Sequence, residues 1–225
     1  MPAEPIDAKP LVDTPDQSCA RGILFVVSSP SGGGKGTLIN RVLKTVPGLS
    51  YSVSYTTRVA RNGEVNGVDY FFVSRARFAE LVAANEFLEW ATVHGNLYGT
   101  SHRQVTTELA ANRDLMLEVD VQGAASVRKL MTDSVSVFIL PPSYDVLRQR
   151  LIARGTDSPE ELAVRLHNAP IELRQYVSFD YVIVNDNVDS AAARLAAVIY
   201  SERARRERQE AEVRRVAETF PSFES

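Results

Sequence analysis

Short apolar runs alternate with helical patterns along most of the chain. The runs predict buried strands, since a few consecutive apolar residues between turn-forming residues are typical of a covered sheet. They span residues 23–27, 70–73, 87–93, 115–120, 135–140 and 181–184. Apolar side chains at helical spacing predict helices from near Lys35, over 75–84 and 102–111, after Ser143, and over about 189–218. Strands that alternate with helices predict a parallel sheet covered on both faces.

One section interrupts this alternation. A short strand is expected over residues 51–55, and residues 56–69 are polar, with Asn-Gly turns at 62–63 and 66–67. We therefore expect a separate subdomain inserted into a core. The expected segments are a disordered leader (1–20), a core in three parts (21–51, 102–142 and 167–218), the inserted subdomain (52–101), a helical lid (143–166) and a tail (219–225).

Composition restricts the class of protein. The chain has 225 residues, of which 44% are hydrophobic, enough for one large domain with insertions. A net charge of −3 gives no reason to expect binding to nucleic acid or to an anionic membrane surface. The apolar runs are far shorter than the ~20 residues of a membrane helix, and the proline-rich acidic leader is unlike a signal peptide. Cys19 is the only cysteine, which excludes an internal disulfide and suits a reducing cytoplasm.

The most informative segment is a glycine-rich turn between the first apolar run and the first helix. It reads Ser29-Pro30-Ser31-Gly32-Gly33-Gly34-Lys35-Gly36-Thr37. A strand, such a turn and a helix that opens on Lys-x-Thr form a phosphate-binding loop, which predicts ATP binding by backbone N–H groups and Lys35. The consensus has a hydroxyl where this chain has Gly36, so we expect Thr37 to supply the hydroxyl for Mg²⁺. The alternative is a glycine-rich turn with an exposed lysine.

A second cationic group lies in the inserted section. Arg58 and Arg61 are three residues apart in a polar loop, and Tyr70 adds a hydroxyl. Guanidinium groups suit bidentate binding of a phosphate. Together with the glycine-rich loop, this group predicts two phosphorylated substrates. The alternative is a pair of solvated surface arginines.

Around these arginines the chain resembles the guanylate kinases, enzymes that move the γ-phosphoryl group of ATP onto GMP. The motif is Ser-x-Thr-Thr-Arg-x-x-Arg-x-Gly-Glu-x-x-Gly-x-Asp-Tyr, over residues 54–70. The resemblance extends over roughly residues 22–205. Further stretches that agree in order and spacing are 86–91, 95–100, 120–123, 141–143, 150–155 and 182–186.

The resemblance implies a GMP site. Its phosphate would be held by Arg58, Arg61, Tyr70 and Tyr98, and its base would lie beside Ser54, Glu89, Thr100 and Asp120. Glu89 suits guanine, because one carboxylate can accept from both N1–H and the exocyclic amino group, a donor pair that adenine lacks. The alternative for Glu89 is an exposed surface acid. Glu118 stands where many relatives have Asp, and its contact would be with the nucleotide or with Mg²⁺.

The third cationic group lies on two predicted helices. Arg150 and Arg154 are one turn apart, Gly155 ends their helix, and a capping box at residues 158–161 begins the next one. By resemblance, Arg150, Arg154 and Arg165 close on the transferring phosphoryl group as a lid. The alternative is a solvated helix face.

Asn185 and Asp186 end the last predicted core strand, where ligands gather in open α/β sheets. The resemblance places this pair near the adenine of ATP, and a turn with a helix cap would use the same residues. His94, His102 and His167 have no metal-ligand spacing, so we expect structural or surface roles for them.

These expectations combine into one fold and one function. The fold class is α/β, a parallel sheet of the P-loop NTPase type flanked by helices, with an inserted mixed α+β nucleoside monophosphate subdomain and a small helical lid. The function is guanylate kinase activity with ATP, GMP and Mg²⁺, in the cytoplasm. The expected catalytic residues are Lys35, Arg61, Arg150, Arg154 and Arg165.

Two other functions and one structural question stay open. The chain could be a non-catalytic module that binds phosphorylated peptides, or a kinase with another acceptor such as AMP, since Lys35-Gly36-Thr37 resembles the loop of adenylate kinases. The mixed charges of residues 202–215 fit a solvated helix or a contact in a homo-oligomer.

Overall fold

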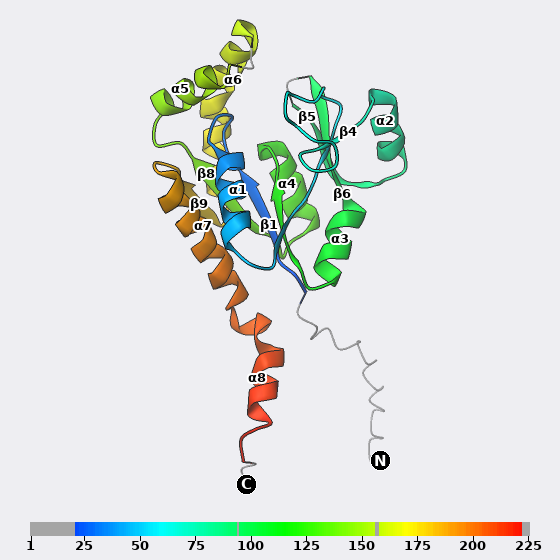
Figure 1. Ribbon diagram of the computed structural model, residues 1–225, viewed down its shortest axis with the longest axis vertical. Helices are drawn as coiled ribbons and strands as arrows, with labels where there is room; N and C mark the ends of the chain where they lie inside the picture. The colour runs from blue at the N-terminus through cyan, green and yellow to red at the C-terminus, as the bar shows by residue number, and fades with distance from the viewer. Residues whose placement is uncertain (1–20, 94, 156–157, 222–225) are drawn as a thin grey trace, which may run out of the picture.

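The computed structural model describes residues 21–93, 95–155 and 158–221. A parallel sheet forms the centre of the molecule, and a second, smaller sheet lies to one side of it (Figure 1). The leader with Cys19, His94 and the last four residues of the tail lie outside the described residues. Within the described ranges, no helix combines the length and apolarity needed to cross a membrane.

The central sheet has five strands in the order β2-β7-β1-β8-β9, and every pair is parallel. β1 lies in the middle, and all its side chains are buried because helices cover both faces. The prediction of a parallel sheet is confirmed. The strands are β1 (Leu24–Ser28), β2 (Leu49–Tyr51), β7 (Asp114–Glu118), β8 (Val135–Leu140) and β9 (Tyr181–Val184).

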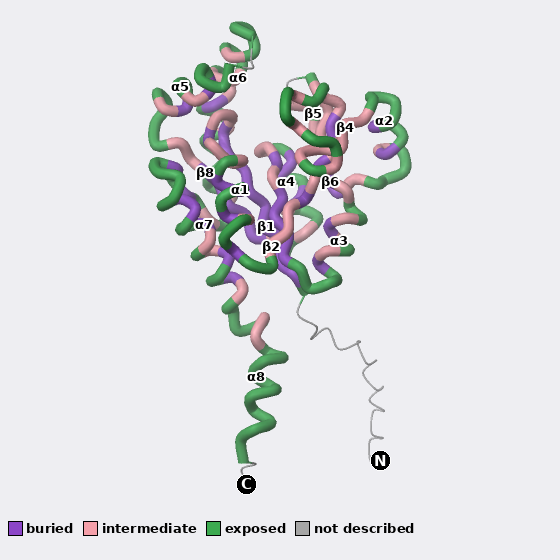
Figure 2. Tube along the Cα trace, in the orientation of Figure 1, coloured by how far each residue is buried: buried purple, intermediate pink, exposed green. Residues whose placement is uncertain are grey.

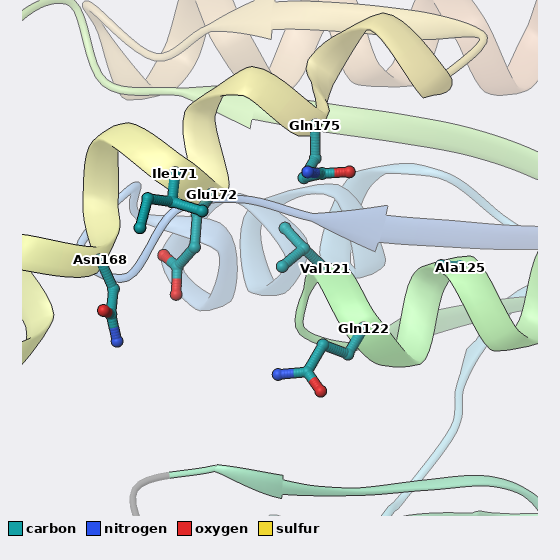
Figure 3. Close-up of a pocket in the computed structure, with 7 residues that line it drawn as sticks. All are labelled: Val121, Gln122, Ala125, Asn168, Ile171, Glu172 and Gln175. Carbon is teal, nitrogen blue, oxygen red and sulfur yellow. The ribbon is translucent and has the colours of Figure 1, made fainter.

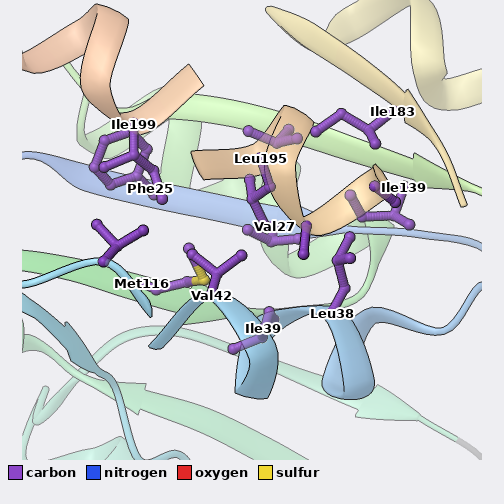
Figure 4. Close-up of a cluster of buried hydrophobic side chains, with 14 of the residues drawn as sticks. Phe25, Val27, Leu38, Ile39, Val42, Met116, Ile139, Ile183, Leu195 and Ile199 are labelled. Atoms are coloured by element: carbon purple, nitrogen blue, oxygen red, sulfur yellow. The ribbon is translucent and has the colours of Figure 1, made fainter. Parts of the chain in front are cut away.

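Alternate residues of β1 pack into two cores, since successive side chains of a strand point to opposite faces. Phe25 and Val27 contact one core with α1 (Lys35–Thr45) and α7 (Val188–Arg203), which Figure 4 shows. Leu24 and Val26 contact the other core, with α3 (His102–Ala110) and α4 (Val121–Leu130). Buried residues accordingly concentrate along the central strands (Figure 2).

The second sheet is mixed and has the order β4-β3-β6-β5. β3 and β4 are parallel, and the other pairs are antiparallel. Its aromatic side chains pack over Gly99, where a Cβ would come within 3.1 Å of the rings of Phe78 and Phe87. This unit is the predicted mixed α+β insertion. Its elements are β3 (Tyr55–Thr56), β4 (Phe71–Phe72), α2 (Arg75–Ala83), β5 (Phe87–Val93) and β6 (Asn96–Ser101).

Two helices stand beside the start of α1, on the opposite side of the central sheet from the second sheet (Figure 1). α5 (Tyr144–Arg154) begins at a cap in which Ser143 accepts the Val146 N–H, and Gly155 ends it with φ 60°. α6 (Pro159–Leu173) begins with the predicted capping box between Ser158 and Glu161. A short 3₁₀ turn, η1 (Arg174–Ser178), follows.

The structure corrects two predictions. The expected strand 51–55 is two strands in different sheets, because the Ser52 N–H donates to Met116 in the central sheet while Tyr55 already pairs with Gly99. The expected helix 189–218 is broken after α7, where the Gln209 side chain donates to the Arg203 carbonyl. A 3₁₀ turn, η2 (Arg206–Arg208), and α8 (Glu210–Ala217) replace it. The pattern also predicts neither β6 nor α4.

Asp114 joins three elements at the amino ends of the strands. Its carboxylate accepts from the Ile23 N–H at 2.7 Å and from Arg203 Nε at 2.6 Å, and the residue is only 8% exposed. This pair therefore fixes the start of β7, the entry to β1 and the end of α7.

Replacing Asp114 with Ala should lower the free energy of unfolding by about 2–4 kcal/mol, because it leaves the Ile23 N–H and the Arg203 charge without their partner. Urea denaturation would measure the loss. The matched control is Glu80→Ala, which removes an exposed ion pair with Arg77 and should cost no more than about 0.5 kcal/mol. Equal losses in the two variants would contradict the buried role of Asp114.

Candidate active site

The glycine-rich loop connects β1 to α1, as predicted. Gly32 and Gly34 have φ angles of 87° and 89°, in the left-handed region that favours glycine. Lys35 is the first residue of α1, and its Nζ donates to Ser29 Oγ at 3.0 Å. The lysine therefore lies back over the loop that it follows, as a phosphate-binding lysine should.

Asn185 and Arg150 hold the outer side of this loop. The Gly33 carbonyl accepts from Asn185 Nδ2 at 3.1 Å and from Arg150 Nη1 at 3.3 Å. Arg150 Nη2 also donates to the Asn185 carbonyl at 2.9 Å. A Cβ on Gly34 would lie 2.5 Å from Asn185 Nδ2, so only glycine fits beside this buried amide.

The two residues that follow β9 therefore point to different places. Asn185 is buried under the loop, whereas Asp186 is exposed and contacts Arg194 at 3.4 Å. The structure brings the first of them, and not the second, into contact with the phosphate-binding loop.

Helix α6 supplies two further contacts to the loop. Arg165 Nη1 donates to Ser31 Oγ at 2.8 Å, and the Ser31 N–H donates to Glu172 Oε2 at 2.9 Å. Arg165 is a predicted site residue. Sequence reasoning missed Glu172, although its place two helical turns after Arg165 puts both residues on one helix face.

The arginines of the inserted section, Arg58 and Arg61, lie around Glu64, Tyr70 and Tyr98. Arg58 forms an ion pair with Glu64 at 2.8 Å and lies 5.4 Å from the centre of the Tyr70 ring. Glu64 also accepts the Arg61 N–H at 2.7 Å. Burial alone would raise the pKa of the Glu64 carboxyl, but the hydrogen bonds from Arg58 and the Arg61 N–H, together with the charges of both arginines, lower it overall. The ionised carboxylate is therefore stabilised. Glu64 is a site residue that the predictions missed, although it lies within the motif.

Arg61 is influenced by cations from two parts of the molecule. Burial and the positive charges of Arg154 and Arg58 lower the pKa of the Arg61 guanidinium. Arg154 lies at the end of α5, so the charge of a predicted lid arginine lowers the pKa of a predicted GMP-binding arginine. Like charges held together in this way form a site for a polyanion.

A buried carboxylate lies between the second sheet and the core. Glu89 is 7% exposed, and its Oε1 accepts from Thr100 Oγ1 at 2.6 Å. Burial raises the pKa of Glu89 to about 7, helped by the charge of Asp120 and opposed by the Thr100 hydrogen bond. Asp120 caps α4 by accepting the Gly123 N–H at 2.8 Å. Ser54, the fourth predicted base residue, is also buried.

Oxygen donors flank the far end of the loop. Thr37 is exposed on α1, and a Cβ at position 36 would lie 3.8 Å from Glu118 Oε2. Burial, and a hydrogen bond and charge from Glu118, raise the pKa of Tyr51. Within the described ranges, no three or more His, Cys, Asp or Glu residues gather as a metal site of their own.

Comparison with known proteins identifies the family. The family model described as guanylate kinase matches residues 21–202. The guanylate kinase of Symbiobacterium thermophilum is 50% identical over 185 residues, covering 82% of this chain and 88% of that protein. The guanylate kinase of Neisseria gonorrhoeae is 49% identical over 189 residues, covering 84% and 92%. The chain belongs to the guanylate kinase family.

The fold agrees with that membership. The crystal structure of guanylate kinase from Anaplasma phagocytophilum is similar with a TM-score of 0.72 and 34% identity, covering 84% of this chain and 90% of that one. The resemblance that the motif around Arg58 indicates is thus confirmed, and so is the predicted α/β fold with its inserted mixed sheet. The loop and the carboxylate Glu89 lie within the matched guanylate kinase region.

The raised pKa of Glu89 predicts a pH-dependent stability. Because its folded-state pKa of about 7 lies above the ordinary 4.5, Glu89 supports folding below about pH 4.5, and this contribution is lost as the pH rises through 7. Glu89→Gln should remove the loss, so its stability relative to wild type should rise by about 2–3 kcal/mol between pH 5 and pH 8 in urea denaturation.

Thr100→Val is the matched control for this measurement. It removes the hydrogen bond that lowers the pKa of Glu89, so the loss of stability should begin at the same pH, continue to a higher pH and be larger in total. An identical pH dependence in wild type and Glu89→Gln would contradict the assignment.

Proposed function

We propose that the chain transfers the γ-phosphoryl group of ATP to GMP, giving ADP and GDP. One observation carries this proposal: a phosphate-binding loop with its lysine in place and a buried carboxylate suited to guanine occur together in a member of the guanylate kinase family. An oxygen of the GMP phosphate attacks the γ-phosphorus, the bond to the β–γ bridging oxygen breaks, and ADP leaves with its electrons. The attacking oxygen already belongs to a phosphate, so no strong base is needed.

The donor side would be built by the loop and three arginines. In this proposal the segment from Ser29 to Thr37 binds the phosphates of ATP, and Lys35 neutralises their charge as it develops on transfer. Arg150 and Arg165 already contact the loop, and Arg154 lies within the electrostatic reach of Arg61. They would complete the stabilisation of the transferring group.

The acceptor side would hold the phosphate of GMP between Arg58, Arg61, Tyr70 and Tyr98. Arg58 is held in place by Glu64, so its geometry is set before the substrate arrives. A fixed guanidinium loses little freedom on binding, which favours in-line placement of the two phosphates. Arg61 would also help catalysis, because the charge of Arg154 in the proposed lid acts on its guanidinium.

The base of GMP, or of dGMP, would be read by Glu89 with Ser54, Thr100 and Asp120 beside it. Ionised Glu89 offers two acceptors to the two guanine donors. AMP would leave the buried carboxylate without those donors, which disfavours binding. The positions of Asn185 beneath the loop and of Asp186 just after β9 support a place for ATP at this edge of the sheet.

Mg²⁺ would accompany ATP. The residues near the end of the loop fit this ion, because Thr37 and Glu118 supply hard oxygen donors there. Mg²⁺ usually takes one or two protein side chains together with phosphates and water. The ion would supply neutralisation of phosphate charge. Glu118 would serve the ion or GMP, and its charge also helps to raise the pKa of Tyr51.

Closure of two units would exclude water from the reaction. We propose residues 52–101 as the GMP-binding subdomain and 143–166 as the lid, around a core of 21–51, 102–142 and 167–218. Exclusion of water is required because ATP would otherwise be hydrolysed. The reaction would take place in the cytoplasm, which the single cysteine suits.

A non-catalytic phosphopeptide module is the main alternative from another class. The retained Lys35, its contact with the loop and the three arginines Arg150, Arg154 and Arg165 favour catalysis. An AMP kinase is opposed by the buried Glu89. Incubation with ATP, Mg²⁺ and each of GMP, dGMP and AMP, followed by chromatography of the diphosphates, separates all three functions.

Lys35→Met should reduce GDP formation by at least about 100-fold while circular dichroism stays unchanged, because one preorganised charge on the transferring group is lost. Lys44→Met is the control, since Lys44 is exposed at the other end of the same helix and should leave turnover as it is. EDTA should abolish GDP formation by the wild type until Mg²⁺ is restored. Near-normal turnover by Lys35→Met would refute the role of the lysine.

Glu89→Gln should lower kcat/KM for GMP by about 100-fold and change it little for AMP, because the new amide NH₂ faces guanine donors instead of accepting from them. Steady-state kinetics with both substrates measures the ratio. Glu86→Gln, an exposed acid just before the same strand, should leave the ratio unchanged. If GMP preference survived Glu89→Gln, another group would have to read the base.

A further inference from the structure

The phosphate-binding loop rests on one face of α6. Arg165 and Glu172 are two helical turns apart on that helix, and both contact the same loop residue. Arg165 Nη1 donates to Ser31 Oγ at 2.8 Å, and the Ser31 N–H donates to Glu172 Oε2 at 2.9 Å. The side chain and the backbone of Ser31 are thus both held by α6.

Apolar packing beside these bonds keeps the two helices against the loop. Ala169 lies about one helical turn before Glu172. It is buried against Leu147 and Leu151 of α5. A Cβ on Gly32 would lie 2.9 Å from Leu151 Cγ. The loop therefore meets the helix pair through a close apolar contact and through polar contacts with Arg150, Arg165 and Glu172, of which only Glu172 accepts a loop N–H.

Glu172 also borders open space. It lines a cavity of about 360 Å³ between α4 and α6, together with Gln122 and Asn168, and Figure 3 shows its carboxylate beside that space. A shorter or neutral side chain at position 172 would therefore fit without a clash. Changes at this position test the hydrogen bond and not the packing.

We propose that Glu172 is a positioning residue for phosphoryl transfer, an inference that rests on the proposed function. By accepting the Ser31 N–H, its carboxylate fixes the loop backbone relative to the helix that carries Arg165. A hydrogen bond to an ionised acceptor is roughly twice as strong as a neutral one, and it sets direction as well as distance. Phosphoryl transfer depends on alignment, and a displacement of about 1 Å can cost about 100-fold in rate.

The position of Glu172 distinguishes it from a phosphate ligand. A carboxylate repels the phosphates of ATP, so it can help the reaction only through the groups that it holds. The groups that it holds belong to the donor side, whereas Arg58, Arg61 and Glu89 on the acceptor side have other partners. Loss of Glu172 should therefore affect ATP and leave GMP binding unchanged.

The test compares Glu172→Ala, Glu172→Gln and the control Glu160→Ala, which changes an exposed acid of the same helix. We expect Glu172→Ala to lower kcat/KM for ATP by about tenfold with an unchanged KM for GMP. Glu172→Gln should stay within about threefold of the wild type, because its amide oxygen still accepts the Ser31 N–H. Hydrogen exchange of the Ser31 amide, followed by NMR, should be at least about tenfold faster in Glu172→Ala and near normal in Glu172→Gln.

Three results would overturn the proposal. The first is normal ATP kinetics in Glu172→Ala. The second is a Glu172→Gln variant as impaired as Glu172→Ala, which would assign the effect to charge. The third is an equal loss toward ATP and GMP with a lower melting temperature, which would assign a purely structural role. If the wild type formed no GDP, the proposed function would fail, while Ser31 exchange and calorimetric binding of a non-hydrolysable ATP analogue would still test Glu172.

Discussion

The outward-facing polar groups of the phosphate-binding loop need partners, and the surrounding structure is arranged to provide them. A tight turn with two glycines in the left-handed region cannot satisfy its own backbone as a helix or strand does. The Gly33 carbonyl is satisfied by Asn185 and Arg150, and the Ser31 N–H by Glu172. Because these partners come from the end of β9 and from α5 and α6, the loop joins the sheet to both helices.

Repulsion between cations shapes the other side of the site. The charges of Arg154 and Arg58 both act on Arg61, and Glu64 is the carboxylate that contacts Arg58 and Arg61. One acid neutralises only part of this charge. The remaining positive potential favours a doubly charged phosphate and disfavours neutral compounds of the same shape. The repulsion between these arginines lowers the stability of the fold, whereas the same positive charge favours binding of a polyanion.

Local signals account for most of what the sequence predicts. The apolar runs of β8 and β9 give their bounds correctly, because buried parallel strands need continuous apolar residues. The loop is predictable because its glycines and lysine are adjacent in sequence. β6 is not, since Asn96–Ser101 is largely polar and gains its strand form from pairing with β5.

Long-range partners explain what the sequence does not reveal about the site. Glu172 lies 141 residues from Ser31, and no local pattern links them. The break after α7 has a local partner instead, because the Gln209 side chain donates to the Arg203 carbonyl six residues earlier, and the charged helical pattern continues through it unmarked. The roles of the individual site residues stay predictions, because the family and the fold establish the arrangement and not each contact with substrate.

The contact between Glu89 and α4 has a mechanical consequence. Glu89 Oε2 lies 2.9 Å from where a Cβ on Gly123 would be, so strand β5 of the inserted sheet approaches the core helix α4 closely at Glu89. Because the smaller sheet meets the core helices mainly through β5, a rotation of that sheet that keeps this contact would pivot near Glu89. In such a rotation the loop between β3 and β4, which carries Arg58 and Arg61, would move farther than Glu89, because it lies away from the pivot.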